Sequence, residues 1–101
     1  MTYYKTRPGV FLTKICGEYL LVATKAAREY CPYVRQINKS AAYLWEKVQQ
    51  SVTDEELENA FMETYHIQKE RARKNISSFL KALEENGYIL QEPDKTESNE
   101  R

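Results

Sequence analysis

Few side chains in this sequence have a type and spacing that could support catalysis. The single histidine, His66, lies between Tyr65 and Ile67 and has no oriented partner nearby, so the sequence does not support a general base there. Cys16 and Cys31 have no metal-ligand spacing and no local feature that would lower a thiol pKa. We therefore expect no catalytic residue, no metal site and no cofactor.

The remaining chemistry is that of a binding protein. A phosphate-binding loop is excluded, because Gly9, Gly17 and Gly87 are too widely spaced to form one. The 15 basic and 15 acidic residues cancel, which disfavours nucleic acid as a partner. Residues 1–39 nevertheless hold seven Lys or Arg against two acidic side chains, whereas residues 40–101 hold eight against thirteen. This asymmetry leaves two interpretations open, a solvated surface and a charged binding face.

Length and composition predict one small folded domain. An apolar share of 42% and an aromatic share of 12% argue against a disordered chain of 101 residues. No apolar run approaches the roughly 18 residues of a transmembrane helix, and the N-terminus lacks the apolar core of a signal peptide. We expect a cytoplasmic protein with reduced cysteines and no membrane partner.

The first forty residues predict three strands. Residues 10–16 and 19–24 are rich in β-branched and aromatic side chains, and Gly17-Glu18 between them suits a two-residue type II′ hairpin. A third strand over Tyr33–Ile37 follows Pro32, and proline belongs at a strand start or a sheet edge. An exposed edge could accept an extended peptide as a further strand, or it could pair with a second copy of the chain as a homodimer.

Three helices are predicted after the strands. The first begins at Asn38, a good N-cap, and carries Trp45 on its apolar face. The second begins with a capping box formed by Thr53 and Glu56 and ends near Tyr65. Both helix starts are therefore defined by local hydrogen-bonding side chains.

The third helix, about residues 68–86, has an apolar stripe at helical spacing, and Gly87 is placed to end it. Residues 91–101 show no periodicity, so we expect a disordered tail after a folded domain of residues 1–90. Strands followed by helices predict the α+β class, with the content of a winged helix.

The segment Ile37–Trp45, read I-N-K-S-A-A-Y-L-W, resembles the strand-to-helix signature of PqqD-type proteins, peptide chaperones first named from pyrroloquinoline quinone biosynthesis. That signature is L-N-x-x-A-x-x-(I/L)-W, and here isoleucine replaces its first leucine. The segments V-T-D-E-E-L-E-N-A-F-M-E-T-Y-H-I and N-I-S-S-F-L-K-A-L-E-E-N-G-Y-I resemble the second and third helices of the family. The similarity spans about residues 8–90, and Asn75 departs from it, since the family often has an aspartate there.

The resemblance implies a RiPP recognition element, folded as a winged helix-turn-helix with a three-stranded antiparallel sheet followed by three helices. Such a domain binds the leader of a ribosomally synthesised precursor peptide and presents the precursor to a modifying enzyme, frequently a radical S-adenosylmethionine (radical SAM) protein. The leader would join the sheet beside the third strand and lie against the third helix. The peptide-binding residues implied in this way are Tyr33, Val34, Arg35, Gln36, Ile37, Arg73, Ile76, Ser77 and Leu80.

Two alternatives to leader binding remain. The basic residues Lys69, Arg71, Arg73 and Lys74 stand at the start of the third helix, as in a winged-helix DNA-binding protein. The same fold could also serve an unrelated protein partner. If a leader is the ligand, positive charge on both walls of its groove predicts acidic side chains beside apolar anchors in that leader, the charged residues being Arg35, Arg71, Arg73 and Lys74.

Overall fold

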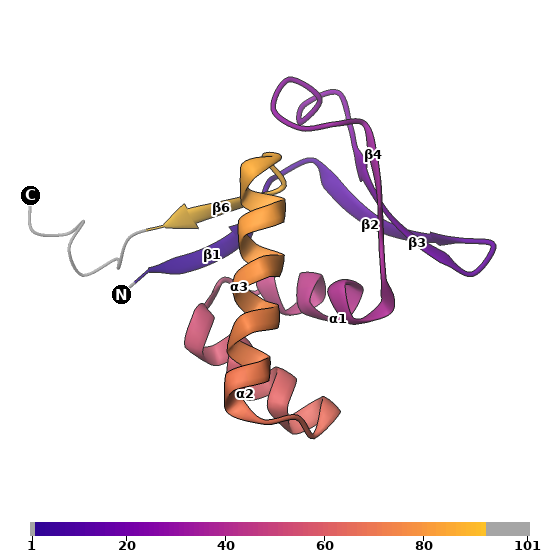
Figure 1. Cartoon of the computed structure of the whole chain (residues 1–101). Helices are drawn as coiled ribbons and strands as arrows, with labels where there is room; N and C mark the ends of the chain where they lie inside the picture. Colours follow the sequence, from indigo (N-terminus) through magenta and orange to yellow (C-terminus); the bar gives the residue numbers. More distant parts are fainter. Residues whose placement is uncertain (1, 93–101) are drawn as a thin grey trace, which may run out of the picture.

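The computed structural model describes residues 2–92, which form two three-stranded antiparallel sheets and three helices (Figure 1). The strands are β1 (Tyr3–Thr6), β2 (Val10–Ile15), β3 (Glu18–Ala23), β4 (Val34–Ile37), β5 (Val52–Thr53) and β6 (Ile89–Glu92). The helices are α1 (Lys39–Val48), α2 (Asp54–Tyr65) and α3 (Lys69–Glu85). The α+β class and the three helices expected from the sequence are confirmed.

The first sheet contains the three predicted strands in the order β2-β3-β4. Leu21 of β3 lies opposite Leu12 of β2 on one side and Arg35 of β4 on the other, so these three side chains share a face. Leu21 is fully buried, which identifies this face as the one packed on the helices. β4 lies at an edge of the sheet, as the preceding proline predicted.

The hairpin between β2 and β3 differs from the expected one. Ile15 pairs with Glu18, so the two loop residues are Cys16 and Gly17 rather than Gly17 and Glu18. Their φ angles are 52° and 80°, and positive φ at both positions defines a type I′ turn instead of type II′. Glycine takes the second place of this turn, and Cys16 accepts a left-handed conformation that costs a non-glycine residue roughly 1 kcal/mol.

The second sheet, of order β5-β1-β6, was not predicted. Its strands are short, and all four residues of β1 are half-buried, so the alternation that reveals a strand is missing. Tyr3 pairs with Glu92, which joins the two ends of the described chain. β6 therefore continues two residues past the expected end of the domain at residue 90, while residues 93–101 of the expected tail lie outside the described residues.

The predicted helix starts are confirmed. The Asn38 side chain accepts the amide hydrogen of Ala41 at 2.8 Å, and Thr53 and Glu56 form the reciprocal capping box that opens α2. Trp45 is fully buried in the core. These local hydrogen bonds account for the abrupt change from β4 to α1 at Asn38.

The end of α3 is also as predicted. Gly87 has a φ of 85°, and its amide donates to the Glu84 carbonyl at 3.1 Å. The amide of Tyr88 donates to the Leu83 carbonyl at 2.9 Å, which completes a Schellman motif.

Figure 1 shows α3 in the middle of the molecule, with β1 and β6 on one side and β4 on the other. The helix therefore presents one flank to each sheet. No helix within residues 2–92 is long and apolar enough to cross a membrane.

Candidate functional site

The open edge of β4 is the first component of the candidate site. β4 pairs only with β3 among the described strands. The Ala23 amide donates to the Tyr33 carbonyl at 2.8 Å, and bonded pairs alternate along an antiparallel ladder, so Arg35 also directs its backbone groups toward β3. The N–H and C=O groups of Val34 and Gln36 therefore face the open edge.

The side chains of β4 separate into two faces. Arg35 is half-buried and Ile37 is 9% exposed, and both lie on the face that packs on the helices. Tyr33 and Val34 are 55% and 46% exposed and line neither of the two grooves described below. The inner face of β4 can thus contact a ligand that also touches the helices.

A groove of about 420 Å³, which we call the β4–α3 groove, lies along this inner face. Arg35, Gln36 and Ile37, three of the residues implied by the resemblance, form its β4 side. Its other walls come from the start of α1, from α2 and from one face of α3, through Asn38, Ser40, Ala41, Leu44, Phe61, Asn75, Ser78, Phe79, Ala82 and Leu83. Its lining is mixed apolar and neutral polar, with a single charged side chain.

The other half of the predicted site lies on a different face of α3. Arg73, Ile76, Ser77 and Leu80 line a second groove, of about 660 Å³, which we call the α2–α3 groove. Ile76 and Leu80 are 1% and 5% exposed and belong mainly to the core. The structure therefore does not bring these four residues together with the β4 edge.

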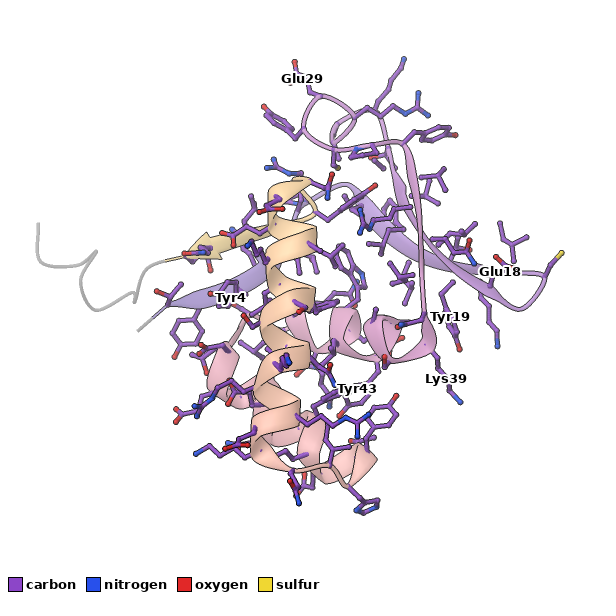
Figure 2. The ribbon with its side chains drawn as sticks, in the orientation of Figure 1. Tyr4, Glu18, Tyr19, Glu29, Lys39 and Tyr43 are labelled. Carbon is purple, nitrogen blue, oxygen red and sulfur yellow. The ribbon has the colours of Figure 1, made fainter. Side chains whose placement is uncertain are left out.

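The residues of α3 that do line the β4–α3 groove were not selected from the sequence. Asn75, Ser78, Phe79 and Ala82 recur at spacings of three and four, which is one helical face. That signal was available, but the helical period alone cannot show which face lies beside β4. In Figure 2, Tyr4 of the α2–α3 groove lies on one side of α3, and Lys39, the residue that begins α1 after β4, lies on the other.

The two grooves differ in charge. The α2–α3 groove is lined by Asp54, Glu55, Glu58, Lys69, Arg73, Lys81, Glu84 and Glu85. The Arg73 Nε lies 3.7 Å from the Glu58 Oε1, so part of this charge is compensated inside the groove. Burial, followed by the charges of Asp54 and Glu84, raises the pKa of the Tyr4 phenol at its rim.

Contacts from the end of α3 hold the loop that leads into β4. Gly87 lies against the Tyr30 carbonyl so closely that a Cβ at this position would clash with it. Arg7 donates from Nε to the Gly87 carbonyl and stacks its guanidinium 4.2 Å from the Tyr30 ring centroid. Tyr88 donates its hydroxyl to the Pro32 carbonyl at 3.0 Å. These contacts fix the position at which the β4 edge begins.

Of the three groups considered for catalysis, Cys16 is exposed in the turn between β2 and β3, whereas Cys31 and His66 take part in local hydrogen bonds. Cys31 is buried and donates its thiol to the Ala27 carbonyl at 3.4 Å, and burial raises the pKa of that thiol. His66 ends α2 in a left-handed conformation, with its amide bonded to the Met62 carbonyl at 2.8 Å. Within residues 2–92 no group of three or more His, Cys, Asp or Glu side chains could hold a metal ion.

Together the fold and the site define a small winged-helix-like domain with an open strand edge beside a helix groove. The family model of Coenzyme PQQ synthesis protein D (PqqD) matches residues 32–89. The match covers more than half of the chain, which therefore belongs to the PqqD family. It includes β4, all three helices and the whole β4–α3 groove.

Two solved structures have a similar fold. A lasso peptide synthetase B1 complexed with the leader peptide has a TM-score of 0.68 at 17% identity, covering 86% of this chain and 96% of that chain. TbiB1 in complex with the TbiA(beta) leader peptide has a TM-score of 0.70 at 17% identity, covering 89% and 99%. At this identity the likeness concerns the fold, and it confirms the fold expected from the sequence. No curated protein sequence matches the chain.

Proposed function

We propose that this protein binds the leader of a ribosomally synthesised precursor peptide as an added strand at β4 and presents the precursor to a modifying enzyme. The observation that carries the proposal is the open β4 edge beside the β4–α3 groove. Membership of the PqqD family and a fold shared with two leader-bound proteins support it. In this role the chain is a non-catalytic cytoplasmic adaptor, and the family resemblance makes a radical SAM enzyme the expected partner.

Strand addition uses the groups that β4 leaves free. A peptide beside β4 exchanges backbone hydrogen bonds with Val34 and Gln36, and every second side chain of that peptide turns toward the groove. Backbone pairing supplies affinity that depends little on sequence, and the groove supplies preference. The residues we propose for the α3 wall are Asn75, Ser78, Phe79 and Ala82, in place of Arg73, Ile76, Ser77 and Leu80.

DNA binding through α3 has less support. Lys69 and Arg73, at the start of the helix, line the α2–α3 groove together with five carboxylates. Arg73 lies beside Glu58 there. A phosphate backbone approaching these cations would meet the neighbouring negative charges, which oppose it.

The proposal is tested by removing one backbone donor from the β4 edge. Gln36→Pro deletes the outward N–H, and an edge strand tolerates proline at such a position. We expect calorimetry with synthetic peptides, taken from the leader of a precursor encoded beside this gene, to give about tenfold weaker binding. Leader peptides N-methylated at the residues paired with Val34 and Gln36 should lose affinity similarly, and they leave the protein unchanged.

The opposite edge of the same sheet provides the matched control. The Thr24 amide donates to the Gly9 carbonyl at 2.8 Å, and the same alternation directs the N–H of Lys14 to the open edge of β2. Lys14→Pro should therefore leave leader affinity unchanged. Equal affinities for the Gln36→Pro variant, the Lys14→Pro variant and the unaltered chain would rule out strand addition at β4.

A second copy of the chain is the competing occupant of the β4 edge. Sedimentation velocity of the free protein separates this case from leader binding. A dimer that Gln36→Pro converts to a monomer, while leader peptides fail to dissociate it, would assign the edge to self-association. A monomer that binds one leader peptide is the expected result.

A further inference from the structure

The β4–α3 groove contains one charged side chain, Arg35. It lies at the centre of the inner face of β4, opposite the fully buried Leu21, and it is half-buried itself. None of the residues that line this groove is acidic. Within residues 2–92, moreover, no carboxylate forms an ion pair with Arg35. The groove therefore contains a cation without a counter-charge.

Three of the other arginines within residues 2–92 have partners, and the fourth, Arg71, is exposed on α3. Arg7 bonds the Gly87 carbonyl, Arg28 stacks 4.0 Å from the Tyr33 ring centroid, and Arg73 lies beside Glu58. A guanidinium presents several donors in a planar fork that matches a carboxylate, and such charge-assisted bonds are the strong ones. The charge of Arg35 also acts on the neutral Tyr88 phenol, but no carboxylate of the described residues pairs with it in the groove, so this partly desolvated guanidinium favours a ligand that brings one.

Ile37 defines a second contact position on the same face. It lies two residues after Arg35, and the adjoining part of the groove is apolar, with Ala41, Leu44, Phe61 and Phe79 in its lining. Side chains in a strand point to the same face at every second residue. In a strand added beside β4, the side chain next to Arg35 and the one next to Ile37 are thus two residues apart, whichever way that strand runs.

We propose that the leader carries an acidic and an apolar side chain two residues apart, the carboxylate bound by Arg35 and the apolar side chain seated beside Ile37. This inference rests on the proposed strand addition and adds the chemical class of the peptide. Arg35 is the specificity-determining residue, and the apolar anchor contributes affinity without choosing a charge. The spacing of two follows from the strand period alone.

The experiment is a selection from a displayed library of random twelve-residue peptides. The unaltered chain should enrich peptides with Asp or Glu two positions from a large apolar residue. Arg35→Glu should enrich Lys or Arg at the first position and keep the apolar residue, because the charge of the site is reversed. A representative acidic peptide should bind the Arg35→Glu variant at least about tenfold more weakly than the unaltered chain.

Arg71→Glu is the matched control, since Arg71 is exposed on α3 and lines neither groove. It makes the same change in net charge and should leave the selected sequences acidic. Arg35→Gln gives a second, milder variant that should lose the preference for acid without gaining one for base. Thermal melting of each variant confirms that the fold is retained.

The outcomes separate the two proposals. If the selected peptides bind the unaltered chain, lose affinity with Gln36→Pro and show no charge preference, the Arg35 assignment is wrong while strand addition stands. If Arg71→Glu changes the selected charge as much as Arg35→Glu does, the effect comes from net charge and the assignment is also wrong. If no peptide is enriched, or if the enriched peptides bind the Gln36→Pro variant as tightly as the unaltered chain, the proposed function is wrong and the inference fails with it.

Discussion

The two grooves on either side of α3 differ in which charged and hydrogen-bonding groups lack a partner within the described part of the protein. The α2–α3 groove is the larger, at about 660 Å³ against about 420 Å³, and charged residues of both signs line it. The β4–α3 groove has one charge, an apolar interior and a strand edge whose backbone groups face outward. The α2–α3 groove partly compensates its own charge, as Arg73 does beside Glu58, whereas an unpaired strand edge and a guanidinium without a carboxylate partner are both satisfied by a peptide.

The comparison also shows how one helix serves two purposes. Ile76 and Leu80 of α3 are buried in the core, and the residues one position before each of them, Asn75 and Phe79, line the β4–α3 groove. Adjacent residues on a helix are about 100° apart, so the face that lines the groove adjoins the buried stripe. The exposed groove residues Asn75 and Ser78 can therefore change without changing the core contacts of the helix, whereas Phe79 packs against the core and Leu83 belongs to it.

The largest effect is expected from Trp45→Ala. Trp45 is fully buried in α1, the helix that also supplies Ala41 and Leu44 to the β4–α3 groove and nothing to the α2–α3 groove. Loss of this side chain should lower the free energy of unfolding by about 3–5 kcal/mol, measured by urea denaturation. Because α1 lines only the β4–α3 groove, Trp45→Ala should also weaken leader binding in that groove.

Tyr65→Ala is the control for an aromatic truncation outside the core. Tyr65 is 37% exposed and contacts the Tyr43 and Phe61 rings. Its loss should cost about 1 kcal/mol. If the Trp45→Ala variant and the unaltered chain have the same denaturation midpoint, Trp45 does not stabilise the packing of α1, and the prediction is wrong.

The parts of the fold that sequence reasoning predicted are those set by local chemistry. Asn38 bonds an amide three residues ahead, Thr53 and Glu56 bond each other across one helical turn, and Gly87 supplies a positive φ. Each signal lies within a few residues of the structure it determines. The second sheet has no such signal, because β1 pairs with β6 at the other end of the described chain.

In the candidate site, too, the part set by local chemistry could be predicted and the part set by long-range packing could not. Proline at the start of the third strand predicted the β4 edge, because proline acts on its own backbone. The α3 residues implied by the resemblance lie on another face of the helix than the one beside β4, because Arg73 and Ser77 fit a helical face as well as Asn75 and Phe79 do. Only the packing of α3 between β4 and α2 decides which face meets the strand.

A pair of substitutions on the two faces of α3 tests the comparison directly. Phe79→Asp places a charge in the β4–α3 groove and removes an apolar contact, so leader affinity should fall on the order of 30-fold, equivalent to about 2 kcal/mol. Ser77→Asp places the same charge in the α2–α3 groove and should change affinity by less than about twofold. Calorimetry with one leader peptide measures both variants.

The test compares the leader affinities of the Phe79→Asp and Ser77→Asp variants. If Ser77→Asp weakens binding as much as Phe79→Asp does, the leader reaches both sides of α3 and the distinction between the grooves fails. Circular dichroism of both variants shows whether Phe79→Asp keeps its helices. Phe79→Leu preserves an apolar side chain and should bind more tightly than Phe79→Asp, which separates loss of contact from loss of fold.

The smallest effect is expected from Arg73→Glu, and it bears on the electrostatics of both grooves. The Arg73 side chain is 62% exposed and Glu58 only 11%, so the substitution puts a like charge beside a largely buried carboxylate. The free energy of unfolding should fall by about 1 kcal/mol or less, because the exposed side chain at position 73 is screened by water. Leader affinity should stay within about twofold, because Arg73 does not line the β4–α3 groove. The double variant with Glu58→Gln removes the repulsion and should recover the lost stability.

Arg35→Glu should weaken the binding of an acidic leader in the same calorimetric titration. If Arg73→Glu and Arg35→Glu reduce leader affinity equally, the leader's charge is attracted by the basic side of the molecule as a whole rather than bound by Arg35.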